Sequence, residues 1–170
     1  MGLFTSRQFD TLNELFLVQL EDLYDAEHRL TKALPKMADA ADSAELKEAF
    51  RSHLQETEGH VRRLEQIFSL LDMEPERDSC DAMKGLISEG DDFVSAKGDP
   101  AVLDAALIAS AQRVEHYEMA GYGTARALAN QLGMQRAADL LQETLDEEGA
   151  ADKKLTRIAE SYANVASPQA

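Results

Sequence analysis

Apolar residues at helical spacing run through four long segments of this 170-residue chain, and no other feature restricts its fold as much. In residues 8–41 they return every three or four positions, as Leu12, Phe16, Leu20, Leu23, Leu30 and Leu34. Such a stripe predicts an amphipathic helix. The same spacing predicts helices at about residues 42–71, 100–131 and 134–163, and a short helix at about 81–96. No stretch has the alternating pattern of a β-strand, so we expect an all-α protein.

Capping residues and a proline indicate where the helices begin or bend. Asp42 and Glu45 have the spacing of a capping box and predict the start of the second long helix. Asp99 followed by Pro100 predicts the N-cap and the first helical position of the third. Pro35 lies inside the first apolar stripe, so we expect a kink or a local break there.

The long helices form two hairpins, one on each side of a connection of roughly 30 residues that contains the short helix. Four helices with one long crossover are the layout of ferritin-like proteins. We therefore expect a ferritin-like up-down four-helix bundle with an additional short helix in the crossover. No repeat or low-complexity tract interrupts the chain, so residues 1–170 are predicted to form one domain that ends in a frayed tail, VASPQA.

The charge of the chain argues against several kinds of partner. Its formal net charge is −15 at pH 7, whereas binding to nucleic acid or to an anionic membrane requires clustered Lys and Arg. Cys80 is the single cysteine, which excludes an internal disulfide and argues against a cysteine-based metal cluster. No apolar run reaches transmembrane length, and the first residues do not resemble a secretory signal. We expect a soluble, cytoplasmic protein with neither nucleic acid nor membrane as a partner.

Each long helix interrupts its own apolar stripe with acidic residues or histidine. Extending the stripe of the first helix by helical steps passes through Glu27, between Leu23 and Leu30. In the second helix the same steps meet His53 and then Glu56 or Thr57. In the third and fourth they meet Glu115 and Glu118, and Glu148 and Asp152. His60 lies on the stripe of the second helix one or two turns further on, and we leave it outside the predicted ligand set. His28 and His116 step off the main faces.

The positions of these acids along the helices indicate that they meet. Glu27 and Glu56 are symmetric about the first hairpin turn, and Glu115 and Glu148 are symmetric about the second. Since both arms of a hairpin rise equally, each pair should share one level, roughly 20–25 Å from its turn at about 1.5 Å per residue. All four helices are therefore expected to place carboxylates at a similar depth.

Ionised carboxylates in a low-dielectric interior repel one another and lose solvation, so they must take up protons or bind cations. Carboxylates and imidazole at one level of a bundle are the ligands of di-iron and di-manganese proteins. We predict a dinuclear metal site with ligands drawn from Glu27, His53, Glu56, Glu89, Glu115, Glu118, Glu148 and Asp152. Glu89, on the short helix, is either a ligand or an acid that supports one. The alternative is that the acids lie on a solvated edge of the bundle.

Five blocks of the chain resemble the YciF/YciE-type ferritin-like proteins of bacterial stress responses: LYDAEHRLTKALPKM, HLQETEGHVRRLEQIF, CDAMKGLISEG, VEHYEMAGYGT and ETLDEEGAADKKL. Their order and spacing extend over about residues 10–160. The resemblance implies a ferritin-like bundle, a homodimer, a dinuclear metal site and protection against oxidative or osmotic stress. In ferritin relatives the second and fourth bundle helices carry Glu-x-x-His. Here the second offers the reverse, His53-x-x-Glu56, and the fourth offers Glu148 and Asp152 without histidine.

Three functions are compatible with the residues. The first is a protein with two iron ions that reacts with oxygen or peroxide, because open positions on adjacent metals can bind O₂ or H₂O₂. The second replaces iron with manganese and gives catalase-like disproportionation, since an oxygen-rich ligand set accepts either metal. The third is a structural or interaction module in which the carboxylates are partly protonated or hold an adventitious ion.

Overall fold

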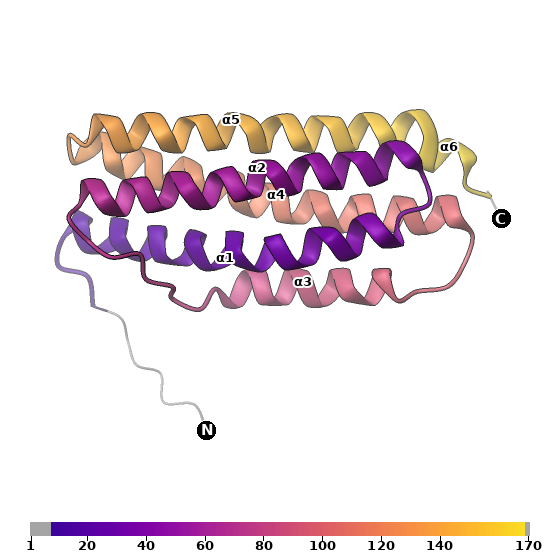
Figure 1. Cartoon of the computed structure of the whole chain (residues 1–170), viewed down its shortest axis with the longest axis horizontal. Helices are drawn as coiled ribbons and strands as arrows, with labels where there is room; N and C mark the ends of the chain where they lie inside the picture. Colours follow the sequence, from indigo (N-terminus) through magenta and orange to yellow (C-terminus); the bar gives the residue numbers. More distant parts are fainter. Residues whose placement is uncertain (1–7, 169–170) are drawn as a thin grey trace, which may run out of the picture.

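Four long helices lie side by side along the longest axis of the molecule (Figure 1), in a computed structural model that describes residues 8–168. The first hairpin consists of α1 (Leu12–Ala40) and α2 (Ala44–Leu70), and the second of α4 (Pro100–Gln131) and α5 (Gln135–Ile158). Both α1 and α5 pack against α2 and α4, so the order around the bundle is α1, α2, α5, α4. None of the described residues forms a β-strand, which agrees with the predicted all-α class.

The crossover returns the chain along the length of the bundle between the two hairpins (Figure 1). It contains α3 (Asp81–Val94), which packs on the outside of α1 and α4. The ferritin-like bundle with a short crossover helix is therefore confirmed. Cys80 caps α3: its buried Sγ accepts a hydrogen bond from the backbone N–H of Met83 at 3.3 Å and contacts the Tyr117 hydroxyl at 3.0 Å. None of the described helices is long and apolar enough to cross a membrane.

Some helix ends differ from the prediction. Ser43, not Asp42, caps α2, because the Ser43 hydroxyl accepts a hydrogen bond from the backbone N–H of Leu46 at 3.4 Å. The predicted cap of α4 is correct, since Asp99 accepts hydrogen bonds from the first backbone N–H groups and Pro100 begins the helix.

Two features expected from the sequence differ in the structure. α1 continues through Pro35 as one helix, so the local break is absent, while the alternative of a kink stays a prediction. Pro35 has no backbone N–H, so the carbonyl group four residues earlier lacks its intrahelical hydrogen bond. Because Pro35 is exposed, water can solvate that carbonyl group, and the helix tolerates the lost hydrogen bond. At the other end, α5 continues as a π-helical turn (Ala159–Ala163) and then as α6 (Asn164–Ala166), so the predicted tail at 165–170 begins within a helix. Residues 169–170 of that tail lie outside the described residues.

A polar layer divides the core of the bundle into two apolar clusters. One cluster lies toward the α1–α2 turn and includes Leu30 and Phe50. The other lies toward the α4–α5 turn and includes Leu23 and Leu64. Between them lie six buried ionisable side chains: Glu27, His53, His60, Glu115, Glu118 and Glu148. Each long helix thus passes from apolar core, through a polar level, into apolar core again.

Asp104 connects the two hairpins near one end of the bundle. Its fully buried carboxylate accepts hydrogen bonds from the backbone N–H groups of Asp42 and Ser43, both at 2.8 Å. Asp104 belongs to α4, and its two partners form the turn between α1 and α2. The carboxylate therefore fixes this turn on the second hairpin.

We predict that Asp104→Ala lowers the free energy of unfolding by about 3 kcal/mol, because two backbone N–H groups lose a charged acceptor. Urea unfolding followed by circular dichroism measures the change. Asp42→Ala is the matched control, since its side chain is exposed and its backbone N–H group remains. It should alter the free energy by no more than about 0.5 kcal/mol. Equal losses in the two variants would contradict the role assigned to Asp104.

Candidate metal centre

The polar layer contains two groups of side chains that could each hold a metal ion. Within each group, one ligand atom of every member lies within 4.8 Å of the others. The first group is His53, Glu115, Glu118 and Glu148, and the second is Glu27, His60 and Glu148. Every long helix contributes at least one member, and Glu148 of α5 belongs to both groups.

His53 is oriented by a carboxylate on its outer side. Its Nδ1 lies 3.2 Å from Oε2 of Glu56, and its Nε2 lies 3.3 Å from Oε1 of Glu115 and 3.7 Å from Oε2 of Glu148. When Nδ1–H donates to Glu56, the lone pair of Nε2 points inward at the two buried acids.

His60 has the same arrangement with the ring nitrogens exchanged. Its Nε2 lies 2.9 Å from Oε2 of Glu147, and its Nδ1 lies 3.2 Å from Oε1 of Glu27 and 3.0 Å from Oε1 of Glu148. Arg63 holds Glu147 in place with two hydrogen bonds of 2.7 Å. Metal-binding histidines commonly donate their second N–H to a carboxylate in this way, so both imidazoles are oriented as metal ligands would be.

Many buried polar atoms of the layer lack hydrogen-bond partners among the described residues. They are both carboxylate oxygens of Glu118 and of Glu148, one carboxylate oxygen each of Glu27 and Glu115, the hydroxyl of Thr57, Nε2 of His53 and Nδ1 of His60. Buried polar atoms are nearly always hydrogen-bonded, so a concentration of exceptions requires an explanation. The oxygens have lone pairs, and the two ring nitrogens have them once they lose their protons, so the donor set fits metal cations.

The pKa values show how strongly the layer resists negative charge. Burial raises the pKa of Glu115, Glu118 and Glu148 above the usual range of a carboxyl group, and neighbouring acids add to the shift of Glu115 and Glu118. Burial alone would lower the pKa of His60, but Glu27 and Glu148 outweigh it and raise the pKa to about 11. The pKa of His53 is raised in the same way, against burial, by Glu115 and Glu56. Without metal, the layer therefore retains protons.

Tyr122 supports the second group. Its buried hydroxyl donates a hydrogen bond to Oε1 of Glu27. Burial, together with the charge of Glu27, raises the pKa of Tyr122 well above its usual range, so the phenol stays protonated. The hydrogen bond restricts Glu27 to one orientation and leaves its Oε2 without a partner.

Five of the eight predicted ligands come together in the layer: Glu27, His53, Glu115, Glu118 and Glu148. Glu56 lies outside both groups, with 41% of its side chain exposed. Asp152 points to the side of α5 that faces α4, where Gln112 donates to it at 2.9 Å and His116 lies 3.3 Å away. Glu89 lies on the outer helix α3, with its carboxylate exposed and 4.0 Å from Arg113.

His60 belongs to the layer although the sequence prediction left it out of the ligand set. A usable signal was present, because His53 and His60 are seven residues apart, which is close to two helical turns. Two histidines at this spacing share one face of α2. Glu147 and Arg63 were also missed, since both lie toward the surface. Glu147 is connected to the layer by its contact with His60, and Arg63 only through its hydrogen bonds to Glu147.

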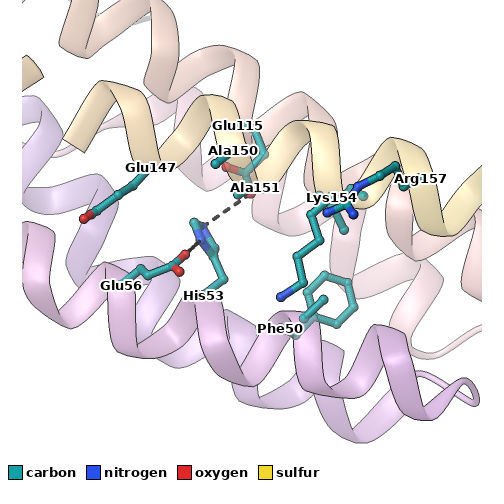
Figure 2. A pocket seen from close by; sticks show the side chains of 11 residues that line it. Phe50, His53, Glu56, Glu115, Glu147, Ala150, Ala151, Lys154 and Arg157 are labelled. Atoms are coloured by element: carbon teal, nitrogen blue, oxygen red, sulfur yellow. Dashed lines mark hydrogen bonds and ion pairs between the residues drawn. The ribbon is translucent and has the colours of Figure 1, made fainter. Parts of the chain in front are cut away.

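A cavity of about 220 Å³ opens between α2 and α5 and leads to the first group. Figure 2 shows His53 and Glu115 in its middle, Glu56 and Glu147 on one side, and Lys154 and Arg157 on the other. The rest of its lining is apolar: Ala49, Phe50, Ala150, Ala151 and Leu155. Neither Glu27 nor His60 lines the cavity, so it reaches the first group alone.

Comparison with known proteins shows where this architecture occurs. The chain is 46% identical over 155 residues to Protein YciF of Escherichia coli strain K12, covering 91% of this chain and 93% of that protein. The crystal structure of the E. coli stress protein YciF matches with a TM-score of 0.86, covering 89% of this chain and 96% of that one. YcfI from Rhodopseudomonas palustris, 44% identical, also gives a TM-score of 0.86, with 90% of this chain and 98% of that chain covered.

A more distant structure shares the fold alone. The chain matches a two-domain protein from Anabaena variabilis, with DJ-1/ThiJ/PfpI-like and ferritin-like domains, at a TM-score of 0.63 and 15% identity. That match covers 94% of this chain and 40% of the other. Residues 11–167 match the family described as "Domain of unknown function (DUF892)". The chain therefore belongs to the DUF892 family and is a relative of the E. coli stress protein YciF, as its five sequence blocks predict.

Proposed function

We propose that this protein holds two metal ions in the polar layer and reacts with oxygen or peroxide. The main support is the position of Glu148 between two groups that each contain one histidine and at least one further carboxylate. Two divalent cations would balance the charge of the four buried carboxylates while both imidazoles stay neutral. Cations would also provide partners for the unpaired atoms of the layer.

The side chains divide into ligands and residues that orient them. The residues that would hold the ions are Glu27, His53, His60, Glu115, Glu118 and Glu148, and Glu148 belongs to both groups. With metal bound, Glu56 and Glu147 would accept the outer N–H groups of the histidines, which leaves the inner nitrogens to the metal ions. Tyr122 donates to Glu27 and limits its rotation.

Iron bound in this layer would supply electrons to O₂ or peroxide, and the same oxygen- and imidazole-rich ligand set accepts manganese. The cavity between α2 and α5 gives small molecules a route to His53 and Glu115. The apolar clusters on both sides of the layer keep water away from the remaining ligands. Since the E. coli relative is described as a stress protein, we place this reaction in protection against stress.

A structural module without redox activity is the second candidate. The observation that favours it is the raised pKa of both histidines and of Glu115, Glu118 and Glu148. Shared protons can reduce the charge of the layer in the absence of metal. The two candidates differ in metal content and in reactivity.

We predict that the chain, reconstituted with Fe(II) without oxygen, holds two ions per chain by elemental analysis. Glu148→Gln should retain fewer than one, because this residue belongs to both groups. Glu118→Gln should lose only the ion of the first group. Glu58→Gln, which changes an exposed acid of α2, is the control and should keep both. A parent chain that holds far less than one ion would support the structural module.

Removing Glu147, which orients His60, should weaken metal binding without removing a ligand. We expect Glu147→Ala to lower the metal affinity about tenfold, because the imidazole loses the carboxylate that orients it. Competition with a chromogenic chelator measures the affinity, and Glu58→Ala is the matched control. Unchanged affinity in Glu147→Ala would show that the orientation of His60 does not depend on this residue.

The iron-loaded chain should be oxidised by O₂ or H₂O₂ faster than free Fe(II) in the same buffer, as followed by stopped-flow absorbance. His53→Ala should abolish the acceleration, because His53 both belongs to the first group and lines the cavity. Oxygen evolution from H₂O₂ with manganese alone would instead support the catalase-like reaction. If neither metal form reacts faster than the free metal, the redox proposals fail and the structural module stands.

A further inference from the structure

We propose that the cavity between α2 and α5 binds a small monocarboxylate with an apolar body. Its carboxylate group would contact Lys154, and its other end would lie against His53 and Glu115. Binding itself requires only the cavity. The idea that the bound molecule is a substrate rests on the proposed function, because its inner end would meet the first ligand group.

The size and walls of the cavity define the body of the ligand. A volume of about 220 Å³ exceeds that of several waters at ~30 Å³ each and falls below the ~300 Å³ at which pockets for drug-sized molecules begin. A single ring or a short hydrocarbon chain is of suitable size. Ala49, Ala150 and Ala151 leave room between α2 and α5, and Phe50 offers a ring face.

The charged side chains of this cavity that have no ion-pair partner among the described residues are both positive. Neither Lys154 nor Arg157 forms an ion pair with any described carboxylate. Figure 2 shows the Lys154 side chain extending from α5 toward Phe50 of α2. The acids on the opposite side are already paired, Glu56 with His53 and Glu147 with His60 and Arg63.

The distribution of charge also sets the orientation. Glu56 and Glu147 lie on the side of the cavity opposite Lys154 and Arg157, so an anionic group is favoured next to Lys154 and Arg157. A single carboxylate suits this arrangement better than a phosphate, because a second negative charge would add repulsion from Glu56 and Glu147. The apolar walls contribute nothing to an inorganic anion and favour an organic one.

Titration calorimetry of the full chain with benzoate tests the proposal, in the metal-free and in the metal-loaded form. Benzoate should bind the parent chain in both. Lys154→Gln should weaken binding at least tenfold, while Lys153→Gln, which changes the exposed neighbouring residue outside this cavity, should leave it within twofold. Benzamide, which has the same ring without the charge, should bind at least tenfold more weakly than benzoate.

Ala151→Leu, which fills the cavity, should abolish benzoate binding while the circular dichroism spectrum stays helical. No benzoate binding by the parent at millimolar concentration, equal binding by Lys154→Gln, or equal binding of benzamide would overturn the proposal. The two proposals can fail separately. A chain that binds benzoate but no metal retains the carboxylate pocket and loses the metal centre, and a chain that binds metal but no benzoate does the reverse.

Discussion

Burial of the Glu148 carboxylate between two histidines is the constraint on which the middle of the bundle depends. Its oxygens lie 3.7 Å from Nε2 of His53 and 3.0 Å from Nδ1 of His60, with three other buried acids in the same layer. Burial raises the folded-state pKa of Glu148 above the usual value of 4.5. The folded chain therefore keeps protons that the unfolded chain releases, and metal-free stability falls as pH rises above about 4.5. The raised pKa of His60 has the same effect, since metal-free stability also falls as pH rises from 6.5 to about 11. Cations would replace these protons and reverse the trend.

The architecture and the level of the site could be predicted because both follow from helical geometry. The stripes at 3.6-residue spacing define the four long helices, and equal rise on both arms of a hairpin defines the depth of Glu27 and of Glu115 with Glu148. The two hairpin turns lie at opposite ends of the bundle (Figure 1). Equal depths still meet, because a helix of 29 residues such as α1 is about 44 Å long and a depth of roughly 20–25 Å is its midpoint.

The ligand set on α2 could not be resolved in the same way. Neighbouring residues differ by about 100° around a helix, and the stripe passes between Glu56 and Thr57. In the structure Thr57 is buried, whereas Glu56 lies on the outer side of the layer, where it contacts Nδ1 of His53. Thr57 stands three residues before His60, where the Glu-x-x-His pattern of ferritin relatives would place glutamate. Asp152 lies outside both groups for a similar reason, because one turn beyond Glu148 the face of α5 has rotated toward Gln112 of α4.

The two halves of the layer differ in access as well as in composition. His53 and Glu115 line the cavity, so the first group can exchange small molecules with the surroundings. Glu27 and His60 are fully buried and held by Tyr122 and Glu147, and Arg63 in turn holds Glu147. Residues of the first group therefore face an external molecule in the cavity, whereas the second group is joined to them only through Glu148. The Glu148 carboxylate is thus a buried charge that the bundle must neutralise. It is also the residue that connects the accessible first group with the enclosed second group.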